Sequence, residues 1–344
     1  MSLLLSKANI GGLNLKNRVV MSPMCMYEVK NEDGILTPFH FAHYGMRAIS
    51  QVGLIITEST AVEPDGRITK NDLGLWNDQQ ADKLKSLVNS IHYLGSKIGI
   101  QLNHAGRKAS DANYPVAPSS FEFSSHYRTP NELTISQIKQ IVQNFGTAAK
   151  RAANSGADMV EIHGAHGYLL HQFLSAVSNK RDDEYGGSLE KRYRIVREVI
   201  EAVRANYNGP IWIRLSLSDY DTTGTQNTIS DWQQIGRWLE ASGIDLIDAS
   251  TGGLTDASPD FPIHDGYQTK FATAMKQAVN IPVSTVGLLD NPGLCEYILQ
   301  NNQADLIMEG RAFLRNTNWL SDAAKYLHDK NFKEFNDSYS RGQN

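Results

Sequence analysis

The sequence is poor in cysteine and contains no long apolar run. Only two cysteines, Cys25 and Cys295, occur among 344 residues, too few for the disulfide network that stabilises small secreted proteins. No stretch approaches the roughly 18 apolar residues of a membrane-spanning helix. The opening MSLLLSKANIGGLNLKN also lacks the basic region and the longer apolar segment of a signal peptide. We therefore expect a cytoplasmic protein that does not associate with a membrane.

The sequence also lacks an excess of positive charge and the common nucleotide-binding motifs. Lys and Arg number 33 against 37 Asp and Glu, a formal charge of -4, so no global field favours nucleic acid as a partner. No G-x-G-x-x-G or Walker-type loop follows an apolar run. A nicotinamide cofactor would therefore not be held by a Rossmann domain.

What the sequence does contain is a repeated alternation of strand and helix patterns. Eight short runs rich in β-branched residues are separated by helix-sized intervals, at 18–21, 53–56, 98–102, 159–162, 211–215, 245–248, 282–285 and 305–308. Repeated βα units predict a parallel sheet, and eight of them predict a TIM barrel of about 250 residues. We expect one domain, 1–344, with a tail from about residue 330. The longest insertion, 105–136, is a loop long enough to be functional.

Polar residues and glycines lie within or directly after the predicted strands. In a TIM barrel the C-terminal strand ends carry the active site, so these residues are the candidates for function. They are found at Ser22, Pro23, Met24, Cys25, Tyr27, Ser59, Gln101, His163, His166, Tyr168, Arg214, Gly287, Gly310 and Arg311.

The histidines after the fourth run allow three interpretations. His163 and His166, with Tyr168 and the later His171, resemble metal ligands in their spacing, but no matching cysteine or carboxylate cluster occurs, and we expect no metal. The histidines could instead cap a strand. The interpretation we favour is two imidazole donors for a carbonyl or phenolate oxygen, with Tyr168 as a nearby proton donor.

Other strand-end residues indicate an anionic cofactor. Gly287 and Gly310 with Arg311 follow the last two strands, where barrels commonly bind phosphate. Arg214 either forms an ion pair with Glu161 or Glu58 inside the barrel, or acts as counter-ion to a planar heterocycle that Gln101 also reads. Cys25 is either a small buried hydrophobe or a nucleophile at the barrel mouth.

Five segments resemble the old yellow enzyme family. The likeness covers residues 15–311, and its motifs are SPMCMY at 22–27, QLNHAGRK at 101–108, HGAHGYL at 163–169, SNKRDDEYGG at 178–187 and EKRY at 190–193. Cysteine after the first strand and histidine at both 163 and 166 are similar to the bacterial, thermophilic-like branch of flavin ene-reductases.

The resemblance implies an FMN-dependent NADPH dehydrogenase that reduces the C=C bond of α,β-unsaturated carbonyl compounds, and a homodimer or homotetramer. Carried over, His163 and His166 would bind the substrate oxygen, Tyr27 would assist, and Tyr168 would donate a proton. The residues implied for FMN are Ser22, Pro23, Met24, Cys25, Ser59, Gln101, Arg214, Gly287, Gly310 and Arg311, with Cys25 tuning its redox potential.

The sequence departs from the family at four places. Ser59 replaces an alanine that faces the flavin, Gly164 replaces an alanine beside the histidines, and Lys191 replaces an asparagine. The tail lacks the usual terminal aromatic residue. In this branch a tail arginine reaches a neighbouring subunit's site, which makes Arg341 a candidate.

Two other functions are compatible with a barrel of this kind. One is a cofactor-free lyase or aldolase in which Lys108 or Cys25 is a covalent nucleophile. The other is a non-catalytic barrel that binds a ligand. The first leaves Gln101, Arg214 and the phosphate-type glycines unexplained, and the second would use the same residues as structural polar groups.

Overall fold

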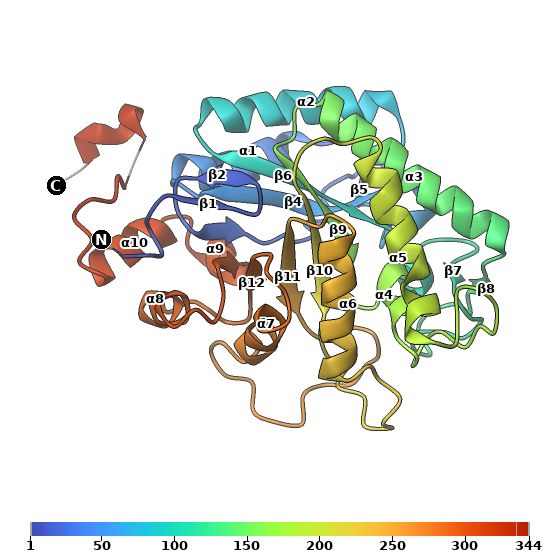
Figure 1. The fold of residues 1–344 in the computed structure, drawn as a ribbon. Coiled ribbons are helices and arrows are strands. Elements are labelled where there is room, and N and C mark those ends of the chain that lie inside the picture. Colours follow the sequence, from blue (N-terminus) through green and yellow to red (C-terminus); the bar gives the residue numbers. More distant parts are fainter. Residues whose placement is uncertain (1, 335, 343–344) are drawn as a thin grey trace.

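The computed structural model describes residues 2–334 and 336–342 and contains a closed barrel of eight parallel strands (Figure 1). Each strand pairs with its neighbours in chain order, and β3 pairs with both β4 and β13 to close the barrel. The strands are β3 (Val19–Met21), β4 (Leu54–Ala61), β6 (Lys97–Asn103), β9 (Met159–Gly164), β10 (Ile211–Ser216), β11 (Leu246–Ser250), β12 (Val283–Thr285) and β13 (Leu306–Glu309). All eight coincide with predicted runs, so the prediction of a TIM barrel is confirmed.

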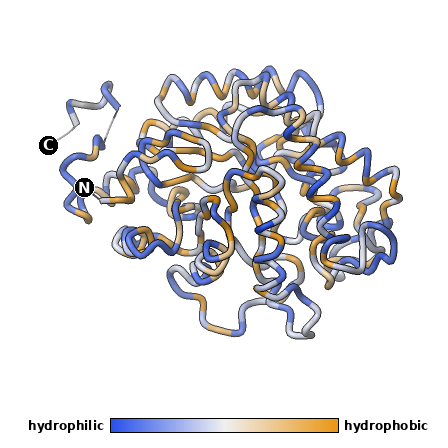
Figure 2. Tube along the Cα trace, in the orientation of Figure 1, coloured by the Kyte–Doolittle hydropathy of each residue, from blue (hydrophilic) through white to orange (hydrophobic). Residues whose placement is uncertain are grey.

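Helices cover the outside of the barrel. They are α1 (Pro38–Ile49), α2 (Asp78–Tyr93), α3 (Ile135–Asn154), α4 (Leu169–Leu174), α5 (Leu189–Arg204), α6 (Ile229–Ala241), α7 (Thr269–Lys276), α8 (Pro292–Gln300), α9 (Arg311–Arg315) and α10 (Trp319–Tyr326). Capping boxes begin four of them, at Thr37, Asn77, Thr134 and Thr228. Polar and apolar residues alternate along the outer helices (Figure 2), as expected where one face packs on a sheet. None of the described helices is long and apolar enough to span a membrane.

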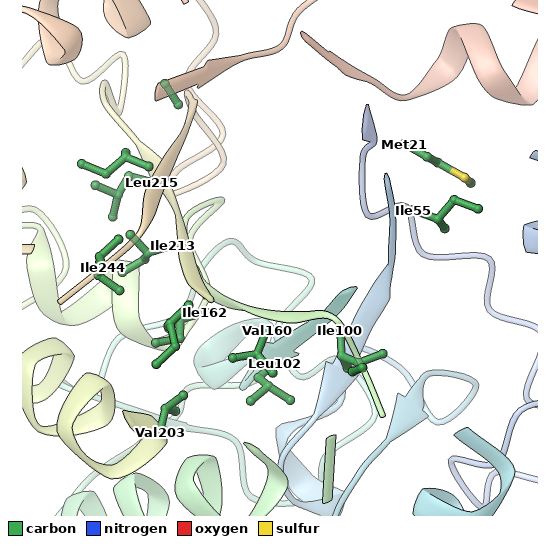
Figure 3. Close-up of a cluster of buried hydrophobic side chains, with 14 of the residues drawn as sticks. Met21, Ile55, Ile100, Leu102, Val160, Ile162, Val203, Ile213, Leu215 and Ile244 are labelled. Atoms are coloured by element: carbon green, nitrogen blue, oxygen red, sulfur yellow. The ribbon is translucent and has the colours of Figure 1, made fainter. Parts of the chain in front are cut away.

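Alternation along the strands builds two separate cores. Outward-facing side chains such as Ile55, Ile162 and Ile213 pack under the helices (Figure 3). Inward-facing side chains such as Leu54 and Trp212 fill the barrel itself. Because successive strand residues face opposite sides of a sheet, the same short runs supply both cores. The strands are consequently buried on both faces.

A hairpin, β1 (Ala8–Ile10) and β2 (Leu13–Leu15), packs against the inward-facing core. The indole N–H of Trp212, near the start of β10, donates to the carbonyl oxygen of Gly11 at 2.9 Å. The hairpin therefore covers the N-terminal end of the barrel, and the C-terminal end is left for the loops that carry the candidate site residues.

The insertion at 105–136 is mostly irregular, as the sequence predicts. It contains a 3₁₀ turn, Gly106–Lys108, and the two-residue strands β7 (Val116–Ala117) and β8 (Asn131–Glu132). A two-residue strand β5 (Leu73–Gly74) extends the sheet beside β4. The described tail, with a 3₁₀ segment at Asp337–Gly342, extends beyond α10 outside the barrel (Figure 1).

Candidate active site at the C-terminal ends of the strands

The loop between β9 and α4 brings two histidines and a tyrosine together. The ring centroid of His163, at the end of β9, lies 5.1 Å from that of His166 and 5.0 Å from that of Tyr168. His166 has a positive φ of 56°, which turns the chain so that both imidazoles face one another. This arrangement agrees with the predicted cluster.

Both imidazoles are neutral. Burial, and then the positive charge of Arg214, lower the pKa of His163 and of His166 well below the usual value. The backbone N–H of Ala165 donates to Nδ1 of His163 at 3.3 Å, which leaves the hydrogen on Nε2. Nε2 of His166 lies 2.8 Å from the hydroxyl of Ser250. At neutral pH His163 can therefore offer an Nε2–H donor, while Nε2 of His166 is already paired with Ser250.

A buried histidine and aspartate hold this loop in place. The N–H of Gly167 donates to Nδ1 of His171 at 2.9 Å, and Nε2 of His171 lies 2.9 Å from Oδ1 of Asp219. The hydroxyl of Ser175 donates to the other oxygen of Asp219 at 2.7 Å. His171 therefore does not join His163 and His166 but supports the backbone between them and α4. This role of Asp219 carried no recognisable signal in the sequence.

Lys108 links the histidine loop to the loop after β11. Its ammonium donates to the carbonyl oxygens of His166 and Gly253, at 3.0 Å each, and lies 5.1 Å from the centre of the Tyr168 ring. Burial and the neighbouring charge of Arg107 lower the pKa of Lys108 to about 8. Both ammonium contacts are to backbone oxygens, which indicates a structural clamp rather than a nucleophile.

Inside the barrel the charged residues pair differently from the prediction. Nε of Arg214 lies 3.0 Å from Oδ2 of Asp248, so an ion pair forms inside the barrel, but its partner is neither Glu161 nor Glu58 as that alternative had it. Arg214 and Asp248 are register partners on β10 and β11, which places their side chains on the same face. Gln101 instead donates to Glu161 at 2.7 Å.

The reason that Glu58 does not reach Arg214 lies in β4. The register of β4 against β6 shifts between Thr57 and Thr60, and such an irregularity redirects a side chain. Glu58 accordingly contacts α1, where the hydroxyl of Tyr44 donates to it at 3.1 Å.

Several buried polar atoms of the barrel interior and strand ends lack a hydrogen bond among the described residues. Two of them that also have no ion-pair partner are Ser22 Oγ and Glu161 Oε1. Because buried polar groups are normally hydrogen-bonded, they fit a polar heterocycle bound above them. Gly287 has a φ of 122°, a backbone conformation accessible to glycine only. It lies two residues after the end of β12, where a phosphate-binding turn is expected. The donor set therefore fits a flavin mononucleotide.

Cys25 and Ser59 have partners of their own. Cys25 packs with Tyr168 on a small apolar cluster beneath the insertion, and burial, followed by the charge of Asp72, raises the pKa of its thiol well above the usual value. The thiol is therefore protonated at neutral pH. The hydroxyl of Ser59 accepts a hydrogen bond from the amide of Asn103 at 2.7 Å, a contact that the expected alanine could not make.

The remaining candidates at the strand ends lie after β3 and after β13. Pro23 and Met24 follow β3 beside Ser22, and a Cβ on Gly310 would lie 3.4 Å from the sulfur of Met24. Arg311 begins α9 directly after Gly310. Tyr27, with a φ of 56°, is 40% exposed and hydrogen-bonds to Cys25.

Arg341 is different, because it lies on the exposed tail segment rather than at the strand ends of its own barrel (Figure 1). The departures at 164 and 191 are accommodated without strain. A Cβ on Gly164 would meet the carbonyl oxygen of Arg214 at 3.0 Å, so glycine relieves a tight contact there. Lys191 lies in the first turn of α5, and its N–H donates to Ser188.

Comparison with known proteins identifies relatives along nearly the whole chain. The NADPH dehydrogenase of Listeria monocytogenes serotype 4b is 49% identical over 327 residues, which are 95% of this chain and 96% of that protein. The NADPH dehydrogenase of Bacillus licheniformis is 48% identical and is covered to 94%, as is this chain.

Solved structures agree with these relatives. Morphinone reductase superposes with a TM-score of 0.82 at 28% identity, covering 94% of this chain and 90% of that one. A structure of morphinone reductase in complex with tetrahydroNAD matches with a TM-score of 0.81. The family model for the NADH:flavin oxidoreductase / NADH oxidase family matches residues 6–330. The chain belongs to this family, the old yellow enzyme family that its motifs resemble, and is a flavin-dependent oxidoreductase.

Proposed function

We propose that the protein is an FMN-dependent NADPH dehydrogenase that reduces the C=C bond of α,β-unsaturated carbonyl compounds. The observation that carries this proposal is the convergence of His163, His166 and Tyr168 at the C-terminal end of the barrel. The names of the bacterial relatives support NADPH as the hydride donor. The structure of morphinone reductase in complex with tetrahydroNAD, which has the same fold, supports a nicotinamide compound as ligand.

The candidate cofactor residues divide by chemistry. Bound FMN supplies hydride transfer between NADPH and the alkene. Gln101 and Arg214 would hold the polar edge of the ring, with Arg214 favouring its anionic reduced form. Ser22, Pro23, Met24, Cys25 and Ser59 would line it. Gly287, Gly310 and Arg311 would hold the phosphate, because glycine lets backbone N–H groups approach an anion and arginine offers a bidentate fork.

The substrate residues act on the carbonyl oxygen and the adjacent carbon. Donors from His163 and His166 would bind the oxygen and stabilise negative charge that develops on it, and Tyr27 would assist at the rim. Burial raises the pKa of Tyr168 well above its usual value, so its phenol keeps its proton at neutral pH. Tyr168 would donate that proton to the α-carbon while the β-carbon receives the hydride.

The proposal extends to the whole protein. We propose a single FMN-binding domain over 1–344 with a tail from about residue 330, a homodimer or homotetramer in which Arg341 serves a neighbouring site, and a cytoplasmic location. Small enones, enals or related activated alkenes would be the substrates. Nucleic acid and membranes would not be partners.

Visible spectroscopy tests the proposal most directly. Purified protein should be yellow with flavin absorption bands, and NADPH should bleach them under anaerobic conditions. Adding a panel of enones, enals and maleimides should restore the bands. Colourless protein that does not take up added FMN would refute the proposal and favour a cofactor-free barrel instead.

A further inference from the structure

Glu58 is a buried carboxylate that the proposed chemistry does not use. It is 1% exposed and lies on β4, where the shifted register turns it toward α1. One oxygen, Oε1, accepts from the hydroxyl of Tyr44 at 3.1 Å, and the same hydroxyl oxygen accepts from the N–H of Glu58 at 3.0 Å. His40 Nε2 lies 3.4 Å from Oε1. Two side chains of α1 therefore hold this oxygen of the carboxylate.

The other oxygen of Glu58 reaches the loop after β3. Oε2 accepts from the backbone N–H of Met26 at 3.0 Å. Within residues 23–28 of the described chain, this is the only backbone N–H that donates a hydrogen bond. Met26 stands between Cys25 and Tyr27, and Tyr27 has a positive φ. One contact thus anchors an otherwise irregular segment at the residue next to the thiol.

The thiol is also close to Glu58 along β4. The backbone of Ser59, the next residue, lies beside the sulfur of Cys25 and lowers the pKa of the thiol. The titratable groups that interact electrostatically with the thiol are Asp72, Glu58, Tyr27 and Tyr168. After burial, the charges of Asp72 and then Glu58 raise the pKa of Cys25. Glu58 therefore acts on the thiol through both the backbone and its charge.

We propose that Glu58 is a positioning residue that holds the Cys25 thiol at the flavin-facing end of β3 and places a carboxylate beside it. The inference rests on the proposed function only in placing the flavin beside Cys25. The tether and the charge belong to the protein itself. They can therefore be tested separately from ene-reductase activity.

Alkylation of the holoenzyme by iodoacetamide as a function of pH tests the proposal. Because Cys295 is fully buried, modification of the folded protein reports Cys25, and mass mapping of the adduct verifies the site. The pH midpoint of the rate measures the pKa of the thiol, and the plateau at high pH measures its accessibility. Glu58→Gln should lower the midpoint, giving about tenfold more thiolate below it, since a nearby like charge is removed.

Two variants serve as controls. Glu296→Gln removes another buried carboxylate, one that accepts from the backbone N–H groups of Leu3 and Leu4 at 2.9 Å each. It should leave the midpoint unchanged. Tyr44→Phe loosens Glu58 but preserves its charge, and should also retain the midpoint. An unchanged midpoint in Glu58→Gln, or an equal shift in Glu296→Gln, would overturn the proposal.

A second substitution keeps the test decisive if Glu58→Gln does not fold. Glu58→Asp retains the charge but is one methylene shorter, so it cannot keep the contacts to both Tyr44 and Met26. Its plateau rate should rise severalfold while the midpoint stays near that of the parent protein. A plateau equal to that of the parent protein would overturn the tether. Loss of FMN or of alkene reduction in the parent protein would instead count against the proposed function, and would leave the alkylation result intact.

Discussion

At the scale of single residues, the site depends on polar groups that burial keeps uncharged. His163 and His166 have pKa values well below the usual range because the charged imidazolium loses hydration and faces Arg214. They consequently remain neutral as pH falls from 8 to 6, a range in which an exposed histidine would begin to gain a proton. The proposed binding of a substrate oxygen then relies on hydrogen bonding rather than on a full positive charge.

The first prediction concerns His163. His163→Ala should weaken phenol binding and slow alkene reduction on the order of a hundredfold, because one donor to the developing oxyanion is lost. The charge-transfer band of the flavin measures phenol binding. In the parent protein this binding should vary little between pH 6 and 8, because the two histidines do not change protonation there. Intact phenol binding in the variant would contradict the assigned role.

Tyr168 should affect only one half of the catalytic cycle. Reduction of the flavin by NADPH needs no proton from this phenol, whereas saturation of the alkene does. Tyr168→Phe should therefore leave the reductive half-reaction nearly intact and slow reoxidation by enones, while reoxidation by oxygen persists. Stopped-flow measurements separate the two steps. Equal slowing of both would mean that the ring only supports the loop.

Glu309 makes stability depend on pH. Burial, and then the charge of Asp290, raise its pKa to about 8 from 4.5. A raised pKa means that the native state binds the proton more tightly, so this stabilisation is complete below about pH 4.5 and is lost as pH rises to about 8.

Glu309→Gln cannot titrate. The free energy of unfolding of the variant, minus that of the parent protein, should rise by up to about 4 kcal/mol between pH 5 and 8.5. Urea unfolding at each pH measures this difference. Any packing cost of the amide is the same at every pH. It therefore does not affect how the difference in unfolding free energy changes with pH. Parallel pH profiles for the two proteins would contradict the raised pKa.

At the scale of elements, the hairpin that closes the N-terminal end of the barrel depends on a glycine. Gly11 has a φ of 56°, and a Cβ there would lie 2.7 Å from the indole nitrogen of Trp212. Gly11→Ala should therefore combine the left-handed backbone cost with overpacking, about 2–4 kcal/mol. Thermal unfolding measures the loss.

Gly95→Ala is a matched control for this substitution. Gly95 also has a positive φ, 86°, but a Cβ there meets nothing within 4 Å. The control should carry only the backbone cost, about 1–2 kcal/mol. Equal losses in the two variants would show that contact with Trp212 contributes nothing.

Elements were predictable from the sequence where pattern alone determines them. Each of the eight strands is a short β-branched run, and strand burial on both faces gives such runs a clear signal. The partner of Arg214 was not predictable in this way. It depends on the register of β10 against β11 and on the shift in β4, and both arise only when the barrel closes.

The candidate site shows the same division. His163, His166 and Tyr168 lie close together in one loop, so the sequence indicates their cluster. The contact between His171 and Asp219 spans 48 positions and leaves no local pattern. Lys108 was a plausible nucleophile by residue type, but its two carbonyl partners come from loops distant in sequence.

At the scale of the whole molecule, the tail is the segment that would connect the sites of neighbouring subunits. Arg341 is exposed on the 3₁₀ segment Asp337–Gly342, and this segment lies beyond α10, outside the barrel (Figure 1). If it completes the site of a neighbouring subunit, as proposed, its effect must depend on assembly. A chain that ends at Ser340 should then bind FMN normally but show a higher KM for the alkene.

The single substitution Arg341→Ala should reproduce that rise in KM with little change in kcat for flavin reduction by NADPH, because only the substrate's surroundings change. Mixing this variant with an excess of a Tyr168→Phe variant provides the decisive measurement. If Arg341 acts between subunits, mixed oligomers regain sites that combine an intact Tyr168 with an intact neighbouring Arg341, and the KM of the active sites falls toward the parent value. Unchanged kinetics on truncation would show that the tail does not contribute to any site.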